Sequence, residues 1–267
     1  MYYDAHVHSA ASPDSELCPK EAISVLAQMN LGIVFTEHVD FVTPSAGRNP
    51  HANDLPKQAR DFLFDYETYP YHSLRCETAL MGLEIGLTDA YLPLNKTTAD
   101  GDYDYIIGSI HFVDGNDVYR DYRDIAPLEA DVYCRRYLTY AKEMVEISGF
   151  FDALAHIDYI CRYCASADTL FEYANFPMEF DALFKLIAER NLALEINTSR
   201  FQHGARVIKQ LLPIYTMFKQ LGGKWVTIGS DSHNAESLGR YFKQALEIAR
   251  HAELTPVYFK ERKMHIS

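Results

Sequence analysis

Long apolar runs, an export signal and a cysteine framework are all missing from this sequence. No apolar run approaches the roughly 20 residues that a helix needs to span a bilayer. The first residues, Met1 to Asp4, show no basic segment followed by an apolar core. The five cysteines are an odd number without regular spacing, as is common where thiols stay reduced. We therefore expect a cytoplasmic protein with no membrane segment.

Basic residues are also scarce. Lys and Arg total 25 against 37 Asp and Glu, which gives a formal net charge of −12. A surface of this sign repels the phosphates of nucleic acids over most of its area. We therefore expect a small-molecule ligand and no nucleic-acid partner. The sequence does not indicate an oligomeric state.

The sequence does contain a regular alternation of short apolar runs and longer stretches of helical periodicity. Strands followed repeatedly by helices are typical of β/α units around a parallel sheet. The expected strands cover residues 2–8, 32–37, 80–86, 105–112, 151–156, 193–198 and 225–230. The expected helices cover residues 19–30, 127–148, 177–191, 205–221 and 235–251.

The length of the chain suits one such unit. Its 267 residues slightly exceed the roughly 250 residues of a single α/β barrel, and 48% of them are hydrophobic. We expect a single domain over residues 1–267. A stretch rich in Pro, Asn, Gly and Ser predicts a long loop over residues 41–56, at one mouth of the barrel.

Almost every expected strand ends in a side chain that can bind a metal ion. These side chains are His6, His8, His38, Glu84, His111, His156, Asp231 and His233. In a β/α barrel the carboxyl ends of all strands meet on one face, so these residues would form one ring. Six of the 11 histidines belong to this ring. The other five follow no expected strand, and we interpret them as ordinary hydrogen-bonded residues.

Spacing within the ring supports a metal site. In a strand, His6 and His8 point to the same side and can hold one ion together. Glu84 lies in an apolar strand, where an unpaired buried charge is costly, and a metal ion would remove that cost. Asp14 follows the first strand in a turn, so it either folds back over the site or only forms the turn.

Further carboxylates flank the expected ligands. They are Asp4, Glu37, Asp40 and Asp158. Carboxylates beside a metal site commonly accept a hydrogen bond from the second nitrogen of a ligating imidazole. We expect some of these four to orient the ligands in this way.

Taken together, these motifs resemble the polymerase and histidinol phosphatase (PHP) superfamily, in order and over nearly the whole chain. The motifs are His6-x-His8, Thr36-Glu37-His38, Gly82-Leu83-Glu84, Gly108-Ser109-Ile110-His111-Phe112, Ala155-His156 and Gly229-Ser230-Asp231-Ser232-His233. The fourth of these, with Asn197-Thr198-Ser199-Arg200, is similar to the stand-alone histidinol-phosphatase branch. The resemblance implies an α/β fold, a distorted seven-stranded TIM-like (β/α)7 barrel.

The resemblance also implies three divalent metal ions. Their ligands would be His6, His8, Glu84 and Asp231 for the first ion, Glu84, His111 and His156 for the second, and Asp14, His38 and His233 for the third. Some family members have His at the position of Asp14, which leaves the affinity and identity of the third ion open. Mixed imidazole and carboxylate ligands suit Zn, Mn or Fe better than Ca or Mg.

The reaction expected from the resemblance is hydrolysis of a phosphomonoester. L-histidinol phosphate would give L-histidinol and phosphate, a step of histidine biosynthesis. A metal-bound hydroxide would be the nucleophile, because metal binding lowers the pKa of water to about 7, and no side chain is assigned as the acid. Arg162 and Arg200 each follow a strand end and would bind the phosphate oxygens; the alternative for both is a surface arginine.

Three other functions stay open. The chain could be a PHP-type phosphoesterase for another metabolite phosphate or for nucleic-acid ends. It could be an amidohydrolase, although that family calls for a carbamylated Lys or similar bridge on the fourth strand, and here Glu84 lies on the third. It could be a metal-stabilised binding module without activity, although such modules usually lack ligands and all nine positions are filled here.

Overall fold

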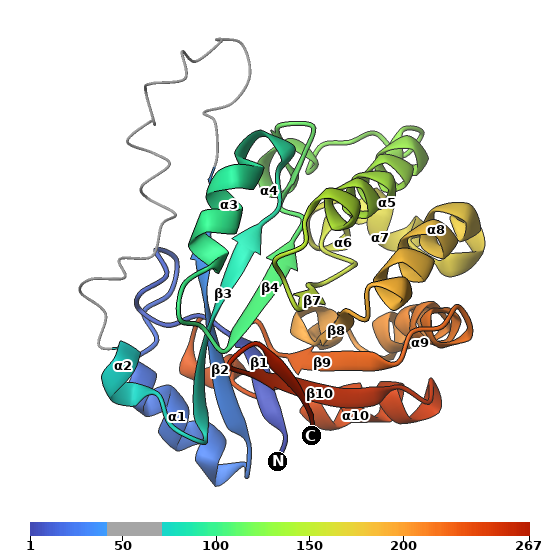
Figure 1. The fold of residues 1–267 in the computed structure, drawn as a ribbon. Coiled ribbons are helices and arrows are strands. Elements are labelled where there is room, and N and C mark those ends of the chain that lie inside the picture. The colour runs from blue at the N-terminus through green and yellow to red at the C-terminus, as the bar shows by residue number, and fades with distance from the viewer. Residues whose placement is uncertain (42–70) are drawn as a thin grey trace.

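The computed structural model describes residues 1–41 and 71–267 (Figure 1). Strands far apart in the sequence form one nine-stranded sheet in the order β1-β2-β3-β4-β7-β8-β9-β10-β11. They are β1 (Tyr3–Val7), β2 (Gly32–Val39), β3 (Ala79–Gly86), β4 (Tyr105–Ser109), β7 (Ala153–Leu154), β8 (Ala193–Asn197), β9 (Trp225–Gly229), β10 (Thr255–Lys260) and β11 (Lys263–Ile266). Neighbouring strands are parallel except β10 and β11. A separate hairpin joins β5 (Phe112–Val113) and β6 (Asn116–Asp117).

The α/β class and the strand positions expected from the sequence are confirmed, with two differences. Strand β7 has only two residues, because after Leu154 the chain leaves the ladder and the His156 amide donates to the Glu195 side chain. Strands β10 and β11 were not expected. In β10, buried Val257 and Phe259 alternate with less buried neighbours, a period of two that marks a half-buried strand.

The sheet curls until β9 lies beside β1 (Figure 1). These strands meet at their carboxyl ends, where the Asp231 amide donates to the His6 carbonyl and the His8 amide to the Ser232 carbonyl, both at 2.8 Å. At the amino end, β10 pairs with β9 instead. The result is the distorted seven-stranded barrel that the sequence predicts, joined at its carboxyl end and extended by β10 and β11.

Helices cover the outer face of the sheet (Figure 1). The longer ones are α1 (Pro19–Gln28), α3 (Leu92–Ala99), α5 (Ala130–Ile147), α8 (Pro177–Glu189), α9 (Ala205–Gln220) and α10 (Phe242–His251). Short helices are α2 (Tyr71–Leu74), α4 (Val118–Asp121), α6 (Ile160–Tyr163) and α7 (Ala165–Leu170), with 3-10 turns η2 (Asp89–Tyr91), η3 (Tyr173–Asn175), η4 (Ser199–His203) and η5 (Ala235–Ser237). Within residues 1–41 and 71–267, no helix has the length and apolar character of a membrane span.

The last helix begins later than expected. The sequence predicts a helix from residue 235, but Ala235 opens only the short turn η5, and α10 starts at Phe242. Gly239 and Tyr241 interrupt the helix because both have positive φ angles, 61° and 55°. Their loop lies at the carboxyl end of β9. The loop expected over residues 41–56 falls, after Phe41, outside the described residues.

The barrel interior changes character along its axis. Its amino-terminal half is apolar, filled by a cluster that includes Tyr3, Leu80, Tyr105 and Phe259. The ring of Phe259 stacks on that of Tyr105 at 5.4 Å between centroids. The additional strand β10 therefore contributes to the apolar packing at the amino-terminal end of the barrel. The carboxyl ends of the strands carry the polar side chains instead, which places the candidate site at the opposite end of the barrel.

Candidate metal centre

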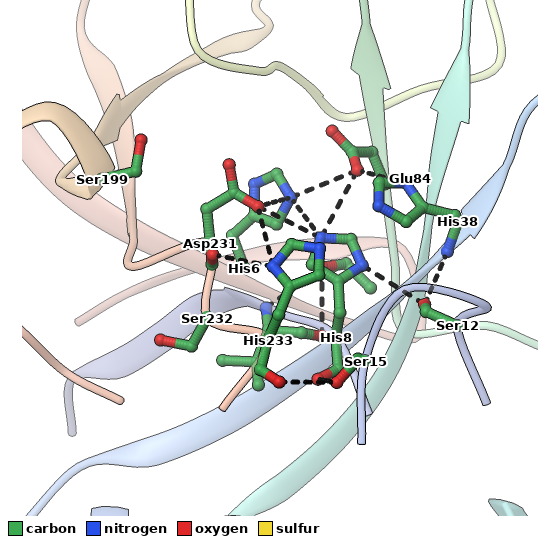
Figure 2. Close-up of polar contacts among 12 residues, drawn as sticks. His6, His8, Ser12, Ser15, His38, Glu84, Ser199, Asp231, Ser232 and His233 are labelled. Carbon is green, nitrogen blue, oxygen red and sulfur yellow. Dashed lines mark hydrogen bonds and ion pairs between the residues drawn. The ribbon is translucent and has the colours of Figure 1, made fainter. Parts of the chain in front are cut away.

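All nine expected ligands lie in one connected cluster at the carboxyl ends of the strands. Figure 2 shows six of them, His6, His8, His38, Glu84, Asp231 and His233. The expected ligands come from β1, β2 and β3 and from the segments that follow β1, β4, β7 and β9. Their members are His6, His8, Asp14, His38, Glu84, His111, His156, Asp231 and His233. Of the five other histidines, His203, His251 and His265 are exposed, as the sequence suggests.

His6, His8, Glu84 and Asp231 place four ligand atoms around one point. The Nε2 atoms of His6 and His8 are 3.1 Å apart. Glu84 Oε2 lies 3.4 and 3.5 Å from these two nitrogens, and Asp231 Oδ1 lies 3.6 and 3.3 Å from them. A tetrahedral ion with ligand bonds of about 2.1 Å separates its ligands by about 3.4 Å. These five distances are close to the separation of two ligands in one such coordination shell.

Glu84 also faces a second group, formed by His111 and His156. Its Oε1 atom lies 2.8 Å from His156 Nε2 and 3.3 Å from His111 Nε2. On the far side of the His111 ring, Nδ1 lies 3.0 Å from Asp40 Oδ1, so this carboxylate fixes the ring's orientation. Because the two oxygens of Glu84 face two different sets of imidazoles, Glu84 has the geometry of a bridging ligand.

Asp14 folds back over the site rather than only forming a turn. Its Oδ2 atom lies 3.3 Å from His38 Nε2 and 3.2 Å from His233 Nε2. The ring of His8 stacks against both imidazoles, with centroids 4.0 Å from His38 and 4.3 Å from His233, and these two are 5.7 Å apart. Asp14 is 48% exposed, so this third group is the part of the centre that solvent reaches most easily.

Glu195 is a buried carboxylate that the sequence reasoning missed. Its Oε1 atom lies 2.7 Å from His6 Nδ1, and Oε2 accepts from the His156 amide at 2.7 Å and from Asn197 Nδ2 at 3.1 Å. It therefore fixes which way the His6 ring turns. The sequence could have indicated Glu195 as a site residue, because Glu195 and Asn197 are polar residues of an apolar strand. They lie two positions apart and hence on the same face of the strand.

The flanking carboxylates hold the loops that carry the ligands. Glu37 accepts from the Ser9 amide at 3.1 Å and from Ser12 Oγ, and Ser12 Oγ lies 3.3 Å from His8 Nδ1. Asp4 accepts from the amide of Ser230 at 2.8 Å. Thus Glu37 acts on His8 through a serine, while Asp4 fixes the end of β9 immediately before Asp231.

Asp231 has an unusual backbone for a ligand. Its φ angle is 56°, in the left-handed region that Asp tolerates better than most residues. The turn is held where β9 meets β1, and a Cβ on the preceding Gly229 would lie 2.3 Å from the His6 Cβ. Glycine is therefore needed at position 229, because β9 approaches His6 closely at that point. This approach directs the Asp231 carboxylate toward His6 and His8.

Electrostatics within the cluster differ from one imidazole to the next. Burial lowers the pKa of His6, but nearby carboxylates, Glu195 first, outweigh it, and the pKa lies well above its usual range. Burial is outweighed in the same way at His111, where Asp40 contributes most to raising the pKa to about 10. At His8, burial and the neighbouring imidazoles together lower the pKa. Without bound cations, His6 and His111 therefore hold protons at neutral pH.

Several buried polar atoms in this cluster have no hydrogen-bond partner. Among the residues that the structure describes, these include Glu84 Oε2, His38 Nδ1 and His156 Nδ1. A buried polar atom left unpaired costs about 1–3 kcal/mol, so such atoms are uncommon. Glu84 Oε2 and His38 Nδ1 lie within ion-pair distance, 2.9 Å, but are not aligned as a hydrogen bond. Buried nitrogen and oxygen atoms at this spacing fit a divalent cation.

Arg162 lies at the edge of the cluster, as expected. Its Nη1 atom is 2.7 Å from Asp231 Oδ2, and Nη2 donates to Asn197 Oδ1 at 3.0 Å. The guanidinium carbon lies 5.1 Å from the centre of the Tyr159 ring, and Nε has no hydrogen-bond partner within residues 1–41 and 71–267. This arginine is therefore placed beside the ligands with one donor uncommitted.

Arg200 is placed differently. Its guanidinium forms ion pairs with Asp158 and Asp168 and donates to Gln210 Oε1 at 3.1 Å. The side chain is 4% exposed. Its donors are thus engaged by carboxylates of α7 and of the turn before α6, and the phosphate contact expected of Arg200 stays a prediction.

Comparison with known proteins identifies relatives that match from end to end. A family model described as PHP domain matches residues 4–199. The probable histidinol-phosphatase of Clostridium acetobutylicum is 36% identical, with 99% of each chain covered. The histidinol-phosphatase of Lactococcus lactis is 26% identical, with 87% of this chain and 84% of that protein covered.

A solved structure shows the same similarity in three dimensions. It is the crystal structure of histidinol phosphate phosphatase from Lactococcus lactis, complexed with zinc, L-histidinol and phosphate. The TM-score is 0.83 at 25% sequence identity, covering 99% of this chain and 98% of that chain. The similarity therefore extends over the whole barrel, including its carboxyl end.

Proposed function

The chain belongs to the PHP domain family, and from this premise we propose that it is a metal-dependent phosphomonoesterase that hydrolyses L-histidinol phosphate to L-histidinol and phosphate. The main support for this substrate is the 36% identity to a probable histidinol-phosphatase over 99% of both chains. The nine-ligand cluster supports the metal dependence. We propose one catalytic domain over residues 1–267, acting in the cytoplasm in histidine biosynthesis.

We propose that the cluster binds three divalent ions, of Zn, Mn or Fe. The distances of the Glu84 and Asp231 carboxylate oxygens from His6 Nε2 and His8 Nε2 support the first. The contacts of Glu84 with His111 and His156 support the second, and those of Asp14 with His38 and His233 support the third. Such ions would lower the pKa of water and offset negative charge on the phosphoryl oxygens.

Protein side chains supply the rest of the site. Arg162 is proposed to bind a phosphate oxygen, because its guanidinium is held beside Asp231 with Nε uncommitted. Asn197 supports it by accepting a hydrogen bond from Nη2. Glu195 keeps His6 in one orientation. A fixed cation at this position would stabilise the extra charge of the transition state at no cost of reorganisation.

A phosphatase assay on metal-reconstituted protein tests the proposal. The panel contains L-histidinol phosphate, other metabolite phosphates and a short oligonucleotide. We expect the highest kcat/KM with L-histidinol phosphate and loss of that activity in Glu84→Gln, with Glu189→Gln on the exposed surface of α8 as the control. Preference for the oligonucleotide would contradict the substrate, and no hydrolysis by fully metallated protein would favour a binding module.

A further inference from the structure

Arg240 lies in the loop between η5 and α10, which is pinned from two sides. The Gly239 amide donates to Asp4 Oδ2 at 2.9 Å, and the Arg240 carbonyl accepts from Thr198 Oγ1 at 2.8 Å. Tyr241 then takes a left-handed conformation, with φ of 55°. The backbone of Arg240 is thereby fixed by a side chain of β1 and by the residue that follows β8.

The guanidinium of Arg240 lacks a strong partner, although it is half-buried. Its Nη2 atom makes only a 3.5 Å contact with the Ser230 carbonyl, and its buried Nε has no hydrogen-bond partner among the described residues. Burial is the main cause that lowers the pKa of Arg240; the negative charges of Asp231 and Asp4 oppose this shift, and the positive charge of Arg162 adds to it. A desolvated guanidinium beside a second cation is costly unless an anion offsets it.

Two further unpaired donors lie in the same region. Arg162 Nε and Ser199 Oγ are buried and have no partner in the described part of the chain. They share one support, because Asn197 Oδ1 accepts from both Arg162 Nη2 and the Ser199 amide at 3.0 Å. Figure 2 shows Ser199 on the Asp231 side of the cluster. Thr198, next to Ser199, is the residue that contacts Arg240.

We propose that Arg240 and Ser199 join Arg162 in an anion site that receives the phosphoryl group and the phosphate product. Asp231 offsets the charge of Arg162, while no carboxylate of the described residues forms an ion pair with Arg240, so the site attracts an anion. A phosphate dianion presents several acceptor oxygens, which matches three separate donors. That the site receives the phosphoryl group of a substrate rests on the proposed function.

Inorganic phosphate is the probe that tests the site independently of turnover. Calorimetric titration of phosphate into metal-reconstituted protein is compared for wild type, Arg240→Met, Arg240→Lys and Ser199→Ala. We expect Arg240→Met to weaken phosphate binding and raise KM for L-histidinol phosphate by about tenfold or more, since charge-assisted hydrogen bonds are among the strong ones. Arg240→Lys keeps the positive charge, so we expect its phosphate affinity to lie between those of Arg240→Met and wild type. We expect Ser199→Ala to weaken phosphate binding less than Arg240→Met does.

The control is Arg250→Met, which removes an exposed arginine of α10 that pairs with Glu247 and His251 on the same helix. Metal content and thermal midpoint are measured for each variant, and we expect both to be unchanged in Arg240→Met. Phosphate affinity within twofold of wild type in Arg240→Met would overturn the inference while leaving the proposed function intact. If Arg240→Met lost phosphate binding but the wild type hydrolysed no phosphomonoester, the proposed function would fail and the anion site would stand.

Discussion

Glu84 is the side chain on which the three ligand groups depend. It is 1% exposed, and its Oε2 atom lies 2.9 Å from His38 Nδ1 while Oε1 lies 2.8 Å from His156 Nε2. Burial opposes its ionisation, but the surrounding imidazoles, His6 first, hold the pKa of Glu84 well below its usual range. A permanently charged carboxylate in the barrel interior requires cations around it.

Glu195 gives a prediction at the scale of one residue. Replacing it in Glu195→Gln removes the charge that faces His6 Nδ1 at 2.7 Å while keeping the size of the side chain. Carboxylates that orient a ligating imidazole typically change metal affinity by about 10–100-fold. We expect metal affinity to fall within that range, measured by competition with a chromogenic chelator, and kcat to fall with it.

The matched control for this prediction is Glu189→Gln, an exposed glutamate of α8. A general loss of folding would lower the thermal midpoint of metal-free Glu195→Gln, so that midpoint is measured as well. If Glu195→Gln bound metal as tightly as wild type, the orienting role of Glu195 would be wrong.

At the scale of elements, Arg200 ties α6 and α7 to the end of β8. It pairs with Asp158, which precedes α6, and with Asp168 in α7. Arg162 lies in α6, between these two anchors. The position of Arg162 beside Asp231 therefore depends on a buried ion pair that itself lies outside the ligand cluster.

Arg200→Met tests whether this arginine acts on the fold or on the phosphate. Removing one partner of a buried ion pair typically costs about 3–5 kcal/mol, so we expect a loss of that size in the free energy of unfolding, measured by urea denaturation. Arg206→Met is the control, because Arg206 is 53% exposed and pairs with the same Asp168, and exposed pairs contribute about 0–1 kcal/mol. An unchanged stability with a raised KM would instead support the phosphate contact.

At the scale of the whole molecule, the candidate metal centre lies at the carboxyl ends of the barrel strands. Its candidate ligands come from residues 6 to 233, so ions bound there would join the first barrel strand to the last. Within the described residues, β9 is joined to β1 by two backbone hydrogen bonds near His6 and Ser232 and by the hydrogen bonds of Ser230 with Asp4. Metal binding should therefore stabilise the closed barrel as well as the site.

The predicted consequence is a stabilisation by metal that grows with pH. The pKa of His111 is raised from 6.5 to about 10, so its interaction with Asp40 stabilises the metal-free fold below pH 6.5 and is lost as pH rises toward 10. A metal ion that binds His111 must displace the proton from its imidazole. The affinity of the protein for metal ions therefore rises with pH. We expect the difference in thermal midpoint between metal-loaded and chelator-treated protein to be larger at about pH 8.5 than at about pH 6.

Calorimetry of both forms in one buffer series measures this difference. Addition of metal to the chelator-treated protein should restore the higher midpoint, which separates metal loss from irreversible damage. A midpoint difference that is constant with pH, or that shrinks as pH rises, would contradict the prediction.

Asp14 entered the set of candidate ligands through the family resemblance, and that set stays a prediction. The sequence alone predicts the seven barrel strands, five longer helices and the other eight candidate ligands. These follow from local rules: an apolar run of the right period, with a His or carboxylate at its end, is visible without knowing its neighbours. The same rules missed β10 and Glu195. The end of α10 nearest the site was also misplaced, because positive φ at Tyr241 is imposed by tertiary contacts.

Only the tertiary structure decided what each of these side chains contacts. Arg162 and Arg200 look alike in the sequence, as arginines that follow a strand end. In the fold, Arg162 lies 2.7 Å from Asp231 with a free donor, whereas Arg200 is enclosed by Asp158 and Asp168. The difference depends on residues brought together from distant strands, and Coulomb energies and burial are set by those distances rather than by sequence spacing.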